Sequence, residues 1–339
     1  MIKVVQFGLG AMGAGMAQLV CSRPGYQLVG VVDRRPDLAG HDMGDLPGFE
    51  DAAGIRISPD AEGLLEQTKP DITLLATGSF ISDIYDDLQN ILRSGSNCIT
   101  IAEEMAYPWR SHFFEANALD KLAKEHGVSL LGAGVNPGFV LDVLVLLLSG
   151  VCSRVESIHA TRVNDLSPFG PTVMRTQGVG LSPEAFAEGI QSGEIVGHIG
   201  FRQSIDMIAD SLGWTLDEIQ EERWPILSNT LRETPHVRVS PGMVAGCRHI
   251  ARGISGGNTV ILLEHPQQVL PEIENVATGD SIEIKGEPPI SLRIQPEIPG
   301  GRATINLAVN MIPQVLGSRA GLLSMPDLPL PRLTGSVDR

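Results

Sequence analysis

The chain has 339 residues, a length typical of about two domains, and a formal net charge of −15 at pH 7. That acidity excludes a nucleic-acid-binding groove, which needs a basic face. Its four cysteines form no CxxC pair and its histidines show no metal-binding spacing, so we expect buried, reduced thiols, no metal and a cytoplasmic protein. The apolar run 139–148 is too short to cross a membrane and contains Asp142, and Met1 leads directly into a predicted strand, which leaves no room for a signal peptide.

The first twenty residues predict a dinucleotide-binding unit. An apolar stretch predicts a buried parallel strand, and Gly8, Gly10 and Gly13 follow it before a helical pattern begins. Gly8 permits a tight turn, Gly10 leaves room for a pyrophosphate, and Gly13 lets the new helix lie close to the sheet. The free N–H groups of the first helical turn, at Ala11, Met12 and Gly13, would then bind the phosphates.

The second strand, 26–32, ends at Asp33, and Arg34 and Arg35 follow directly. A carboxylate here is typical of proteins that bind the ribose hydroxyls of NAD, whereas a guanidinium favours the 2′-phosphate of NADP. We therefore expect use of both cofactors with a slight preference for NAD. The alternative is a charged turn at the surface.

Strands and helices alternate up to residue 131, which predicts a doubly wound parallel sheet in an α/β domain. The expected strands are 71–76, 97–102 and 128–131, and the expected helices are 61–67, 81–93 and 112–126. Residues 40–60 are rich in Gly, Asp and Pro and predict a surface excursion. Thr77 and Gly78 follow a strand at the ligand-binding edge of the sheet, so we expect them on the nicotinamide side.

Glu103 and Glu104 directly follow the strand 97–102, at the edge where the reactive end of a cofactor would lie. Burial would raise the pKa of such a carboxyl group toward the range that suits proton transfer. The structural alternative is a partner for a helix N-terminus. Because neighbours on a strand point to opposite faces, we expect at most one of the two to face a substrate.

The glycine- and proline-rich segment 132–139 predicts a hinge and includes Asn136 and Phe139, which we expect to line a substrate cleft. We interpret 139–148 as a core helix. After residue 157 the pattern changes to an α+β domain with a mixed or antiparallel sheet. We expect loops at 170–180 and 266–279, a single helix over 303–316 and a surface tail after Met325. The expected strands of this part are 157–163, 237–239, 246–254, 259–265, 280–285 and 290–294. Its expected helices are 182–192 and 200–212.

Five polar residues of the second domain are candidates for binding a substrate carboxylate or amine. Arg162 and Asn164 lie near the end of its first strand, Arg175 lies in a glycine-bounded loop with Gln177, and His198 lies between glycines. Each of them, taken alone, is more often structural, because polar residues near glycines usually bond to the backbone.

The whole chain resembles the 2,4-diaminopentanoate dehydrogenases and the related native NAD(P)-dependent amine dehydrogenases. The resemblance rests on the phrases VVQFGLGAMG, DRRP, TIAEEMAYPW, GAGVNPGFVLD, GHIGFRQSI and AVNMIPQVLGSRAGL. It implies a dihydrodipicolinate-reductase-like fold with a Rossmann domain (1–136), an open-faced sheet domain for substrate and dimerisation (137–300) and a C-terminal segment (301–339) that returns to the first. It also implies a homodimer and a catalytic glutamate, for which we favour Glu104 over Glu103.

The function expected from the resemblance is reversible oxidative deamination of an amine to a ketone and ammonia with NAD or NADP. The substrate is either 2,4-diaminopentanoate or a small alkylamine. One alternative is a dihydrodipicolinate-reductase-like reductase of imines or carbonyls, which the absence of an HHxxK motif disfavours. The other is a nucleotide-binding protein without turnover. A serine hydrolase is disfavoured because no GxSxG motif occurs.

Overall fold

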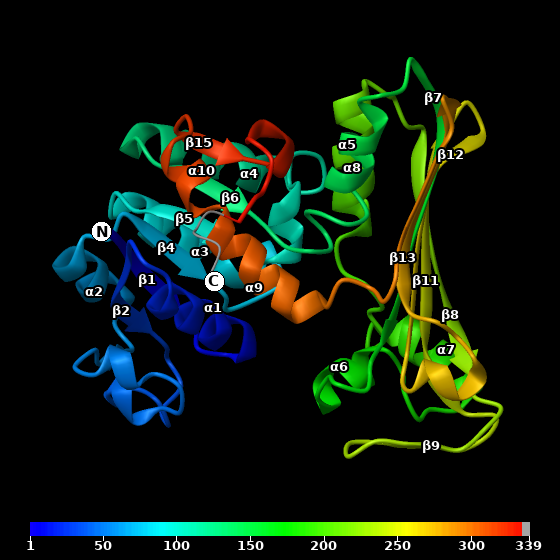
Figure 1. The fold of residues 1–339 in the computed structure, drawn as a ribbon, viewed down its shortest axis with the longest axis horizontal. Coiled ribbons are helices and arrows are strands. Elements are labelled where there is room, and N and C mark those ends of the chain that lie inside the picture. The colour runs from blue at the N-terminus through cyan, green and yellow to red at the C-terminus, as the bar shows by residue number, and fades with distance from the viewer. Residues whose placement is uncertain (334–339) are drawn as a thin grey trace, which may run out of the picture. The chain divides into compact units, whose positions relative to one another are not determined.

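The computed structural model describes residues 1–333 and divides into two compact units. Unit 1 comprises Met1–Phe139 and the C-terminal segment from Pro299 onward, and unit 2 comprises Val140–Ile298. The chain therefore leaves unit 1 once and returns to it, so that residues far apart in sequence share one sheet (Figure 1).

Unit 1 is built on a parallel sheet of seven strands in the order β15-β6-β5-β4-β1-β2-β3. Apart from β15, this order is that of a Rossmann fold, in which the chain reverses direction beside β1. The strands are β1 (Ile2–Phe7), β2 (Tyr26–Val32), β3 (Ile57–Ser58), β4 (Ile72–Leu75), β5 (Asn97–Thr100), β6 (Ser129–Gly132) and β15 (Gly321–Leu323).

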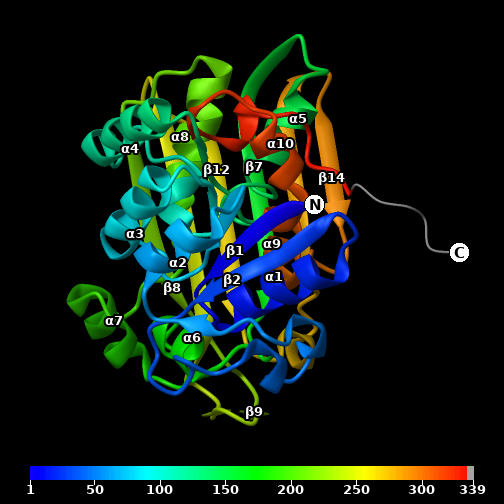
Figure 2. The same cartoon turned by 90° about the vertical axis from the view of Figure 1, so that its left-hand side faces the viewer.

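Helices cover both faces of this sheet. Apolar side chains of α2, α3 and α4 pack against β1, β4 and β5 in one buried cluster, whereas α1 and α9 lie side by side (Figure 1, Figure 2). The helices of unit 1 are α1 (Ala11–Ser22), α2 (Ala61–Thr68), α3 (Ile81–Arg93), α4 (Phe113–His126), α9 (Gly300–Asn310) and α10 (Ile312–Leu316), with the 3₁₀ turns η1 (Met43–Asp45), η2 (Glu50–Ala52), η3 (Glu103–Ala106) and η5 (Met325–Asp327).

Unit 2 is built on a mixed sheet of six strands in the order β14-β13-β7-β12-β11-β8. Its β7 and β12 are parallel, and the other neighbours are antiparallel. The strands are β7 (Arg154–Asp165), β8 (Glu218–Leu227), β11 (Val244–Ser255), β12 (Asn258–Gln268), β13 (Gly279–Glu287) and β14 (Ile290–Ile294), and β9 (Arg232–Glu233) pairs with β10 (Arg238–Val239) in a separate hairpin.

The helices of unit 2 pack on one face of this sheet. Ile205 of α8 meets Gly253 of β11, and Phe186 of α7 packs with Cys247 of the same strand. The helices are α5 (Val143–Ser149), α6 (Pro171–Thr176), α7 (Pro183–Ser192) and α8 (Phe201–Leu212), with the 3₁₀ turn η4 (Pro271–Glu274). Because alternate residues of a strand point to opposite faces, the residues of β11 and β12 next to these contacts face away from the helices.

The predicted α/β class is confirmed, but several elements differ from the expectation. The loop expected at 170–180 contains α6, which begins at a proline in the first helical turn, where the missing N–H costs nothing. The helix expected over 303–316 is interrupted at Met311, and Pro313 lies in the first turn of the second helix. An unexpected strand, β15, forms before Met325. The expected surface tail begins with η5, and its residues 326–333 are exposed or partly exposed, while the last six residues lie outside the described part of the chain.

Two strand expectations were wrong because of proline. β8 was missed since it is acidic and contains Pro225, which is tolerated because β8 is an edge strand. β12 extends through Pro266 to Gln268, and its ladder with β7 skips His265 and Pro266.

Burial also differs at three places. The excursion 40–60 buries Met43 and Phe49 and contains β3. The core helix expected at 139–148 begins only at Val143, and Leu147 is exposed. Cys98 and Cys247 are buried free thiols, whereas Cys21 and Cys152 are partly exposed.

Candidate functional site

The three glycines of the first turn have different surroundings. A Cβ at Gly8, whose φ is +90°, would lie 2.7 Å from the carbonyl oxygen of Ala76. A Cβ at Gly13 would lie 1.9 Å from the carbonyl oxygen of Gly8, so this glycine lets α1 approach the turn itself as well as β1. A Cβ at Gly10 would meet nothing within 4 Å. The open space at Gly10 fits a ligand that approaches the backbone closely.

A cavity of about 550 Å³ lies at this turn. Its described lining residues are Phe7, Gly8, Gly10, Asp33, Arg34, Arg35, Pro36, Ala76 and Thr77. Gly78, Ala11, Met12 and Gly13 do not line it, but the last three form the first turn of α1, whose N–H groups have no acceptor within the helix. The cavity and the helix N-terminus together fit a dinucleotide.

Asp33 connects the end of β2 to the glycine-rich turn. Its Oδ2 accepts a 2.8 Å hydrogen bond from the N–H of Leu9, and its Oδ1 accepts from the backbone N–H and Nε of Arg35, at 2.9 and 3.1 Å. These bonds hold the pKa of Asp33 below its ordinary value although burial opposes them. Arg34 instead lies over the ring of Phe7 and pairs with Asp87 at 2.6 Å. Arg35 is thus bound to Asp33, the carboxylate that we expect to bind the ribose hydroxyls of NAD.

Glu103 and Glu104 lie in the 3₁₀ turn η3 and not on a strand, so strand alternation does not separate them. Burial raises the pKa of Glu103, against the effect of a hydrogen bond with the Ser79 side chain. Glu104 accepts a 2.8 Å hydrogen bond from the N–H of Ile81 at the start of α3 and lies 3.2 Å from His112. The two carboxylates therefore have different environments at the same edge of the sheet.

A row of polar residues crosses the sheet of unit 2 on the face that carries the helices. Asp280 of β13 pairs with Arg162 of β7, His265 of β12 pairs with His249 of β11, and His249 pairs with Arg223 of β8. Between β12 and β7 the pairings of the flanking residues place His265 level with Arg162. Strands more than a hundred residues apart thus bring these side chains together.

His198 and His265 lie within this row. Their ring centroids are 4.9 Å apart, and Nε2 of His265 is hydrogen-bonded to Oδ1 of Asn164. Burial, followed by the neighbouring histidine and Arg162, lowers the pKa of both imidazoles well below its ordinary value. Nε2 of His198 and Nδ1 of His265 are buried and have no hydrogen-bond partner among the described residues. Two neutral imidazole nitrogens are therefore available to a ligand.

Arg162 is almost completely buried, and its charge is already paired. Its guanidinium donates a 2.6 Å hydrogen bond to Oδ1 of Asp280 and a second to the carbonyl oxygen of Ile298. Burial raises the pKa of Asp280 against the effect of this pairing. The structure thus brings Arg162 together with Asn164 and His198.

Three other candidates lie elsewhere. Arg175 has an exposed side chain on α6. Asn136 follows β6 in unit 1, where both atoms of its amide group are buried without a partner among the described residues, and Phe139 is partly buried at the end of the same segment. Gln177 donates a 2.7 Å hydrogen bond to the carbonyl oxygen of Gly197, next to His198.

Sequence reasoning missed His249 and His265. Neither has a partner at metal-binding spacing, and the predicted strand over 259–265 ends at His265 because Pro266 follows it. The pattern of alternating residues on β11 and β12 was available, but the register between the strands was not.

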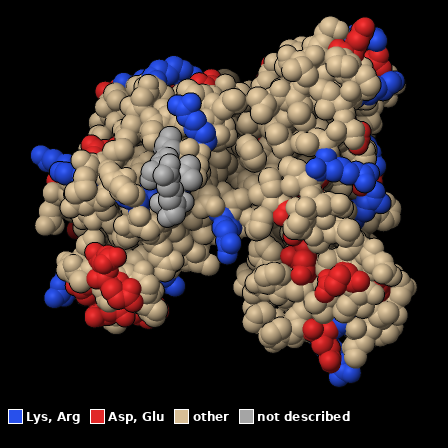
Figure 3. All heavy atoms as spheres, in the orientation of Figure 1, with Lys and Arg blue, Asp and Glu red and all other residues tan. Residues whose placement is uncertain are grey.

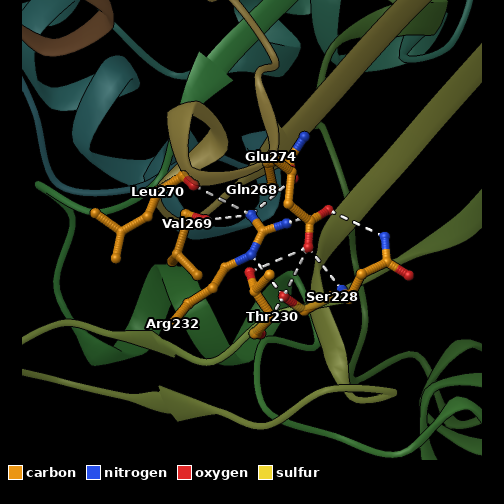
Figure 4. A network of polar contacts seen from close by, with 8 residues as sticks. Ser228, Thr230, Arg232, Gln268, Val269, Leu270 and Glu274 are labelled. Carbon is orange, nitrogen blue, oxygen red and sulfur yellow. Dashed lines mark hydrogen bonds and ion pairs between the residues drawn. The ribbon is translucent and has the colours of Figure 1, made fainter.

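A second buried arginine shows what a purely structural network looks like. Arg232 of β9 is fully buried and bonds to the Ser228 hydroxyl, the Gln268 side chain and the carbonyl oxygen of Val269, and it lies 2.9 Å from Glu274 (Figure 4). These partners all belong to the chain itself. The network ties the β9–β10 hairpin to the end of β12.

Among residues 1–333 no group of three or more His, Cys, Asp or Glu side chains has the arrangement to hold a metal ion. Within the same range no helix is long and apolar enough to span a bilayer. The face drawn in Figure 3 shows basic and acidic side chains in scattered groups with broad uncharged areas between them.

The parallel sheet and the glycine-rich turn define a protein with a dinucleotide-binding Rossmann domain. The 2,4-diaminopentanoate dehydrogenase C-terminal domain matches residues 139–338. A 2,4-diaminopentanoate dehydrogenase of Acetoanaerobium sticklandii is 44% identical over 98% of this chain and 94% of its own. The chain therefore belongs to the 2,4-diaminopentanoate dehydrogenase family.

Two amine dehydrogenases are more distant relatives. One, from Streptomyces virginiae, is 26% identical over 100% of this chain and 99% of its own. The structure of another, from Mycobacterium smegmatis, has a TM-score of 0.86 and 28% identity over 98% of this chain and 97% of that one. The chain is thus an NAD(P)-dependent oxidoreductase that acts on amines, which confirms the expected activity over the two alternatives.

Proposed function

We propose that this enzyme catalyses the reversible oxidative deamination of 2,4-diaminopentanoate, with release of ammonia. The 44% identical relative bears that name. The observation that carries the proposal is the pair of buried nitrogens on His198 and His265, which have no hydrogen-bond partner within residues 1–333. A neutral imidazole nitrogen accepts a hydrogen bond from an ammonium group, or donates one to a carboxylate, according to its tautomer.

Recognition of the substrate is proposed to rest on the polar row of unit 2. His198 and His265 would bond to its amino groups, and Asn164 would fix the ring of His265 through their hydrogen bond. Arg162 would attract the carboxylate electrostatically, although Asp280 already takes part of its hydrogen-bonding capacity. Asn136, Phe139 and Arg175 are further proposed contacts, with Arg175 the least supported because its side chain is exposed.

Residues of unit 1 are proposed to hold the cofactor, NAD or NADP. The first turn of α1 would bind the pyrophosphate above Gly10, and Asp33 would bond to the ribose hydroxyls of NAD. Arg35, which now donates to Asp33, would turn to the 2′-phosphate of NADP and so permit both cofactors, with a slight preference for NAD. Thr77 and Gly78, after β4, would lie on the nicotinamide side.

The two carboxylates are proposed to have two roles. When bound, the nicotinamide cofactor takes up a hydride from the amine-bearing carbon in the forward direction. Glu103, whose pKa is raised by burial, would take up the proton that leaves the ammonium group or the attacking water. Glu104, which the resemblance favoured as the catalytic residue, accepts from the N-terminus of α3 and is proposed instead to stabilise the positive charge of the iminium.

The second domain is also proposed to form a homodimer through the sheet face that lacks helices. Trp224 is 55% exposed on this face, and Val260 and Leu262 are half-buried there. The Glu264 carboxylate on the same face is bonded to His159 and Arg248, which hold its pKa at about 2. Because these charges are already paired, covering them with a second copy costs less desolvation.

The four cysteines, all free thiols in the structure, support a reducing compartment such as the cytoplasm. Three domain roles are part of the proposal: dinucleotide binding by 1–136, substrate binding and dimerisation by 137–300, and completion of the first domain by the C-terminal segment 301–339.

Initial rates of NAD⁺ and NADP⁺ reduction test the substrate. With 2,4-diaminopentanoate we expect a kcat/KM at least about 100-fold above that with 2-aminobutane, because a polar pocket discriminates strongly against an analogue that leaves its groups unpaired. Equal or faster oxidation of 2-aminobutane would instead define an amine dehydrogenase of broad scope. No oxidation of either amine would contradict the proposal.

Glu103→Gln and Glu104→Gln test the carboxylate roles as a matched pair. We expect Glu103→Gln to lower kcat by about 10²–10⁴-fold and to remove the acidic limb of the pH–rate profile. Glu104→Gln should lower kcat while leaving that limb in place. Dinucleotide affinity, measured by fluorescence titration, should stay within about twofold in both. A lost acidic limb in Glu104→Gln alone would reverse the assignment.

A further inference from the structure

His249 lies at the centre of a hydrogen-bonded network behind His198. It is fully buried on β11, and its Nδ1 accepts a 3.0 Å hydrogen bond from the backbone N–H of His198. Its Nε2 lies 3.1 Å from Oε2 of Glu221 on β8. Glu221 in turn lies 3.3 Å from Nη2 of Arg223.

These contacts determine where His249 carries its proton. Nδ1 accepts from a backbone N–H and must therefore present a lone pair, so the proton of the neutral ring is on Nε2 and is donated to Glu221. Burial lowers the pKa of His249 and favours this neutral form. In the other tautomer, an Nδ1–H group would face the N–H of His198. Glu221 thus selects the tautomer that can hold the backbone of His198.

The segment 195–200 that carries His198 contains no regular secondary structure, and side chains hold its successive peptide groups. Nε of Arg223 donates a 2.7 Å hydrogen bond to the carbonyl oxygen of Val196. Gln177 bonds to the next carbonyl, that of Gly197, and His249 bonds to the N–H that follows. Gly197 has a φ of +68°, and a Cβ there would lie 2.9 Å from Nδ1 of His249.

We infer that Glu221, His249 and Arg223 are positioning residues, which hold the 195–200 segment so that the imidazole of His198 stays beside His265. They belong to the same face of the sheet as His265, since His249 pairs with His265 on one side and with Arg223 on the other. The inference rests on the proposed function only in that His198 contacts the substrate. It assigns a role in the reaction to β8, one of the strands that the sequence did not predict.

The contrast with Arg232 explains why this network is more than a structural tie. Arg232 bonds to carbonyl oxygens at the end of β12 and holds a hairpin. The network of His249 ends instead on the two peptide groups that precede His198, and the imidazole of His198 carries a buried nitrogen without a partner among the described residues. A displacement there moves a ligand-binding atom directly, and an error of about 1 Å in such a position lowers rates by about 100-fold.

The test is a double-mutant cycle on amine oxidation by the full-length enzyme. His249→Leu removes both hydrogen bonds, and we expect kcat/KM to fall by about 10–100-fold. His249→Asn keeps an acceptor where Nδ1 lies and a donor beside it, so it should restore activity to within about fivefold of the wild type. His236→Leu, at an exposed histidine of the hairpin, is the matched control and should have no effect.

The decisive comparison is with His198→Ala. If His249 acts through His198, the double variant His198→Ala/His249→Leu should be no slower than His198→Ala alone. If the fold-losses in kcat/KM of the two single variants multiply in the double variant, the inference is overturned. Full activity of His198→Ala would instead contradict the proposed role of His198, so the two failures are distinguishable.

A second variant and a spectroscopic readout guard against loss of folding in His249→Leu. Glu221 is partly exposed, so Glu221→Leu should fold and should allow the Nδ1–H tautomer of His249 to appear. Long-range ¹H–¹⁵N correlation of the ring should show only the Nε2–H tautomer in the wild type and a mixture in Glu221→Leu, with kcat/KM reduced in parallel. An unchanged tautomer together with unchanged kinetics would overturn the inference.

Discussion

The cofactor site and the imidazole row differ in how the chain builds them. The glycine-rich turn consists of the three residues between β1 and α1, and its hydrogen-bonding partners from the end of β2 are Val32, Asp33 and Arg35. The imidazole row takes one residue from each of five strands and His198 from a loop. The first is specified by backbone conformation and close approach, and the second by strand register.

Because of this difference, the two sites should be sensitive to different kinds of substitution. In the turn, the critical feature is space, because a Cβ at Gly13 would overlap the carbonyl oxygen of Gly8. In the imidazole row, the critical feature is hydrogen bonding, since each buried polar group needs a partner in the protein or in a ligand. A single methyl group should therefore damage the first, and a change of hydrogen-bonding capacity should damage the second.

The largest expected effect is that of Gly13→Ala against Gly10→Ala. With its Cβ 1.9 Å from a backbone oxygen, Gly13→Ala should lower the free energy of unfolding by about 3 kcal/mol and abolish dinucleotide binding. Gly10→Ala, whose Cβ points into open space, should leave stability within about 0.5 kcal/mol and weaken dinucleotide binding by at least about tenfold.

Urea denaturation and fluorescence titration with NAD⁺ check these two variants. Equal stability losses would show that both glycines are needed only for the turn, and the cofactor would then have to approach the backbone elsewhere. Equal binding with equal stability would remove the reason for assigning the cavity to the pyrophosphate.

The same contrast explains what sequence could and could not predict. Most strands of the Rossmann sheet and the glycine-rich turn follow from local patterns. β3 and β15 were not predicted, because segments of two and three residues carry little periodicity. Arg162, Asn164 and His198 were identified as candidates. Their assembly was not, because it depends on β12 continuing through Pro266 and on the pairing of His265 with His249.

The carboxylates illustrate a third case, in which the residues were found but their surroundings were not. The pair Glu103 and Glu104 was evident from its position after a strand. The hydrogen bond from the N–H of Ile81 to Glu104 requires α3 to begin beside η3, and this placement depends on tertiary structure. Local sequence therefore identifies a carboxylate at the ligand edge, whereas the division of roles depends on packing.

An intermediate effect should appear in the pH dependence of stability. His198, His249 and His265 are neutral when folded, and burial lowers the pKa of each. Below about pH 6.5 their unfolded forms bind protons that the folded forms do not, so stability should fall with acid by up to about 1.4 kcal/mol per pH unit for each group.

Glu103, in unit 1, should change stability with pH in the opposite direction. Its folded pKa is raised, so its contribution to the free energy of unfolding is complete below the unfolded pKa and is lost as the pH rises through the folded value.

Urea denaturation of His265→Asn at several pH values tests the histidine prediction. It should show a smaller loss of stability with acid than the wild type, whereas His236→Asn should not. An unchanged slope in His265→Asn would mean that its imidazole is protonated in the folded chain.

The smallest expected effect concerns the choice of cofactor. Arg35→Ala removes the guanidinium that is bound to Asp33, and we expect the ratio of kcat/KM for NADP⁺ to that for NAD⁺ to fall by about tenfold, equivalent to about 1.4 kcal/mol. Asp33→Asn keeps an acceptor for the Leu9 N–H but removes the negative charge, so the ratio should rise by a similar factor.

Arg34→Ala is the matched control for these two variants, because Arg34 lines the same cavity but is paired with Asp87 and lies over Phe7. We expect it to change the ratio by less than about threefold, since a guanidinium that is already paired gains less from a new anion. A larger effect from Arg34 than from Arg35 would mean that the 2′-phosphate displaces Asp87 and not Asp33. The cofactor site would then resemble the imidazole row, in that its specificity would depend on a residue of a distant helix and not on the turn that follows β2.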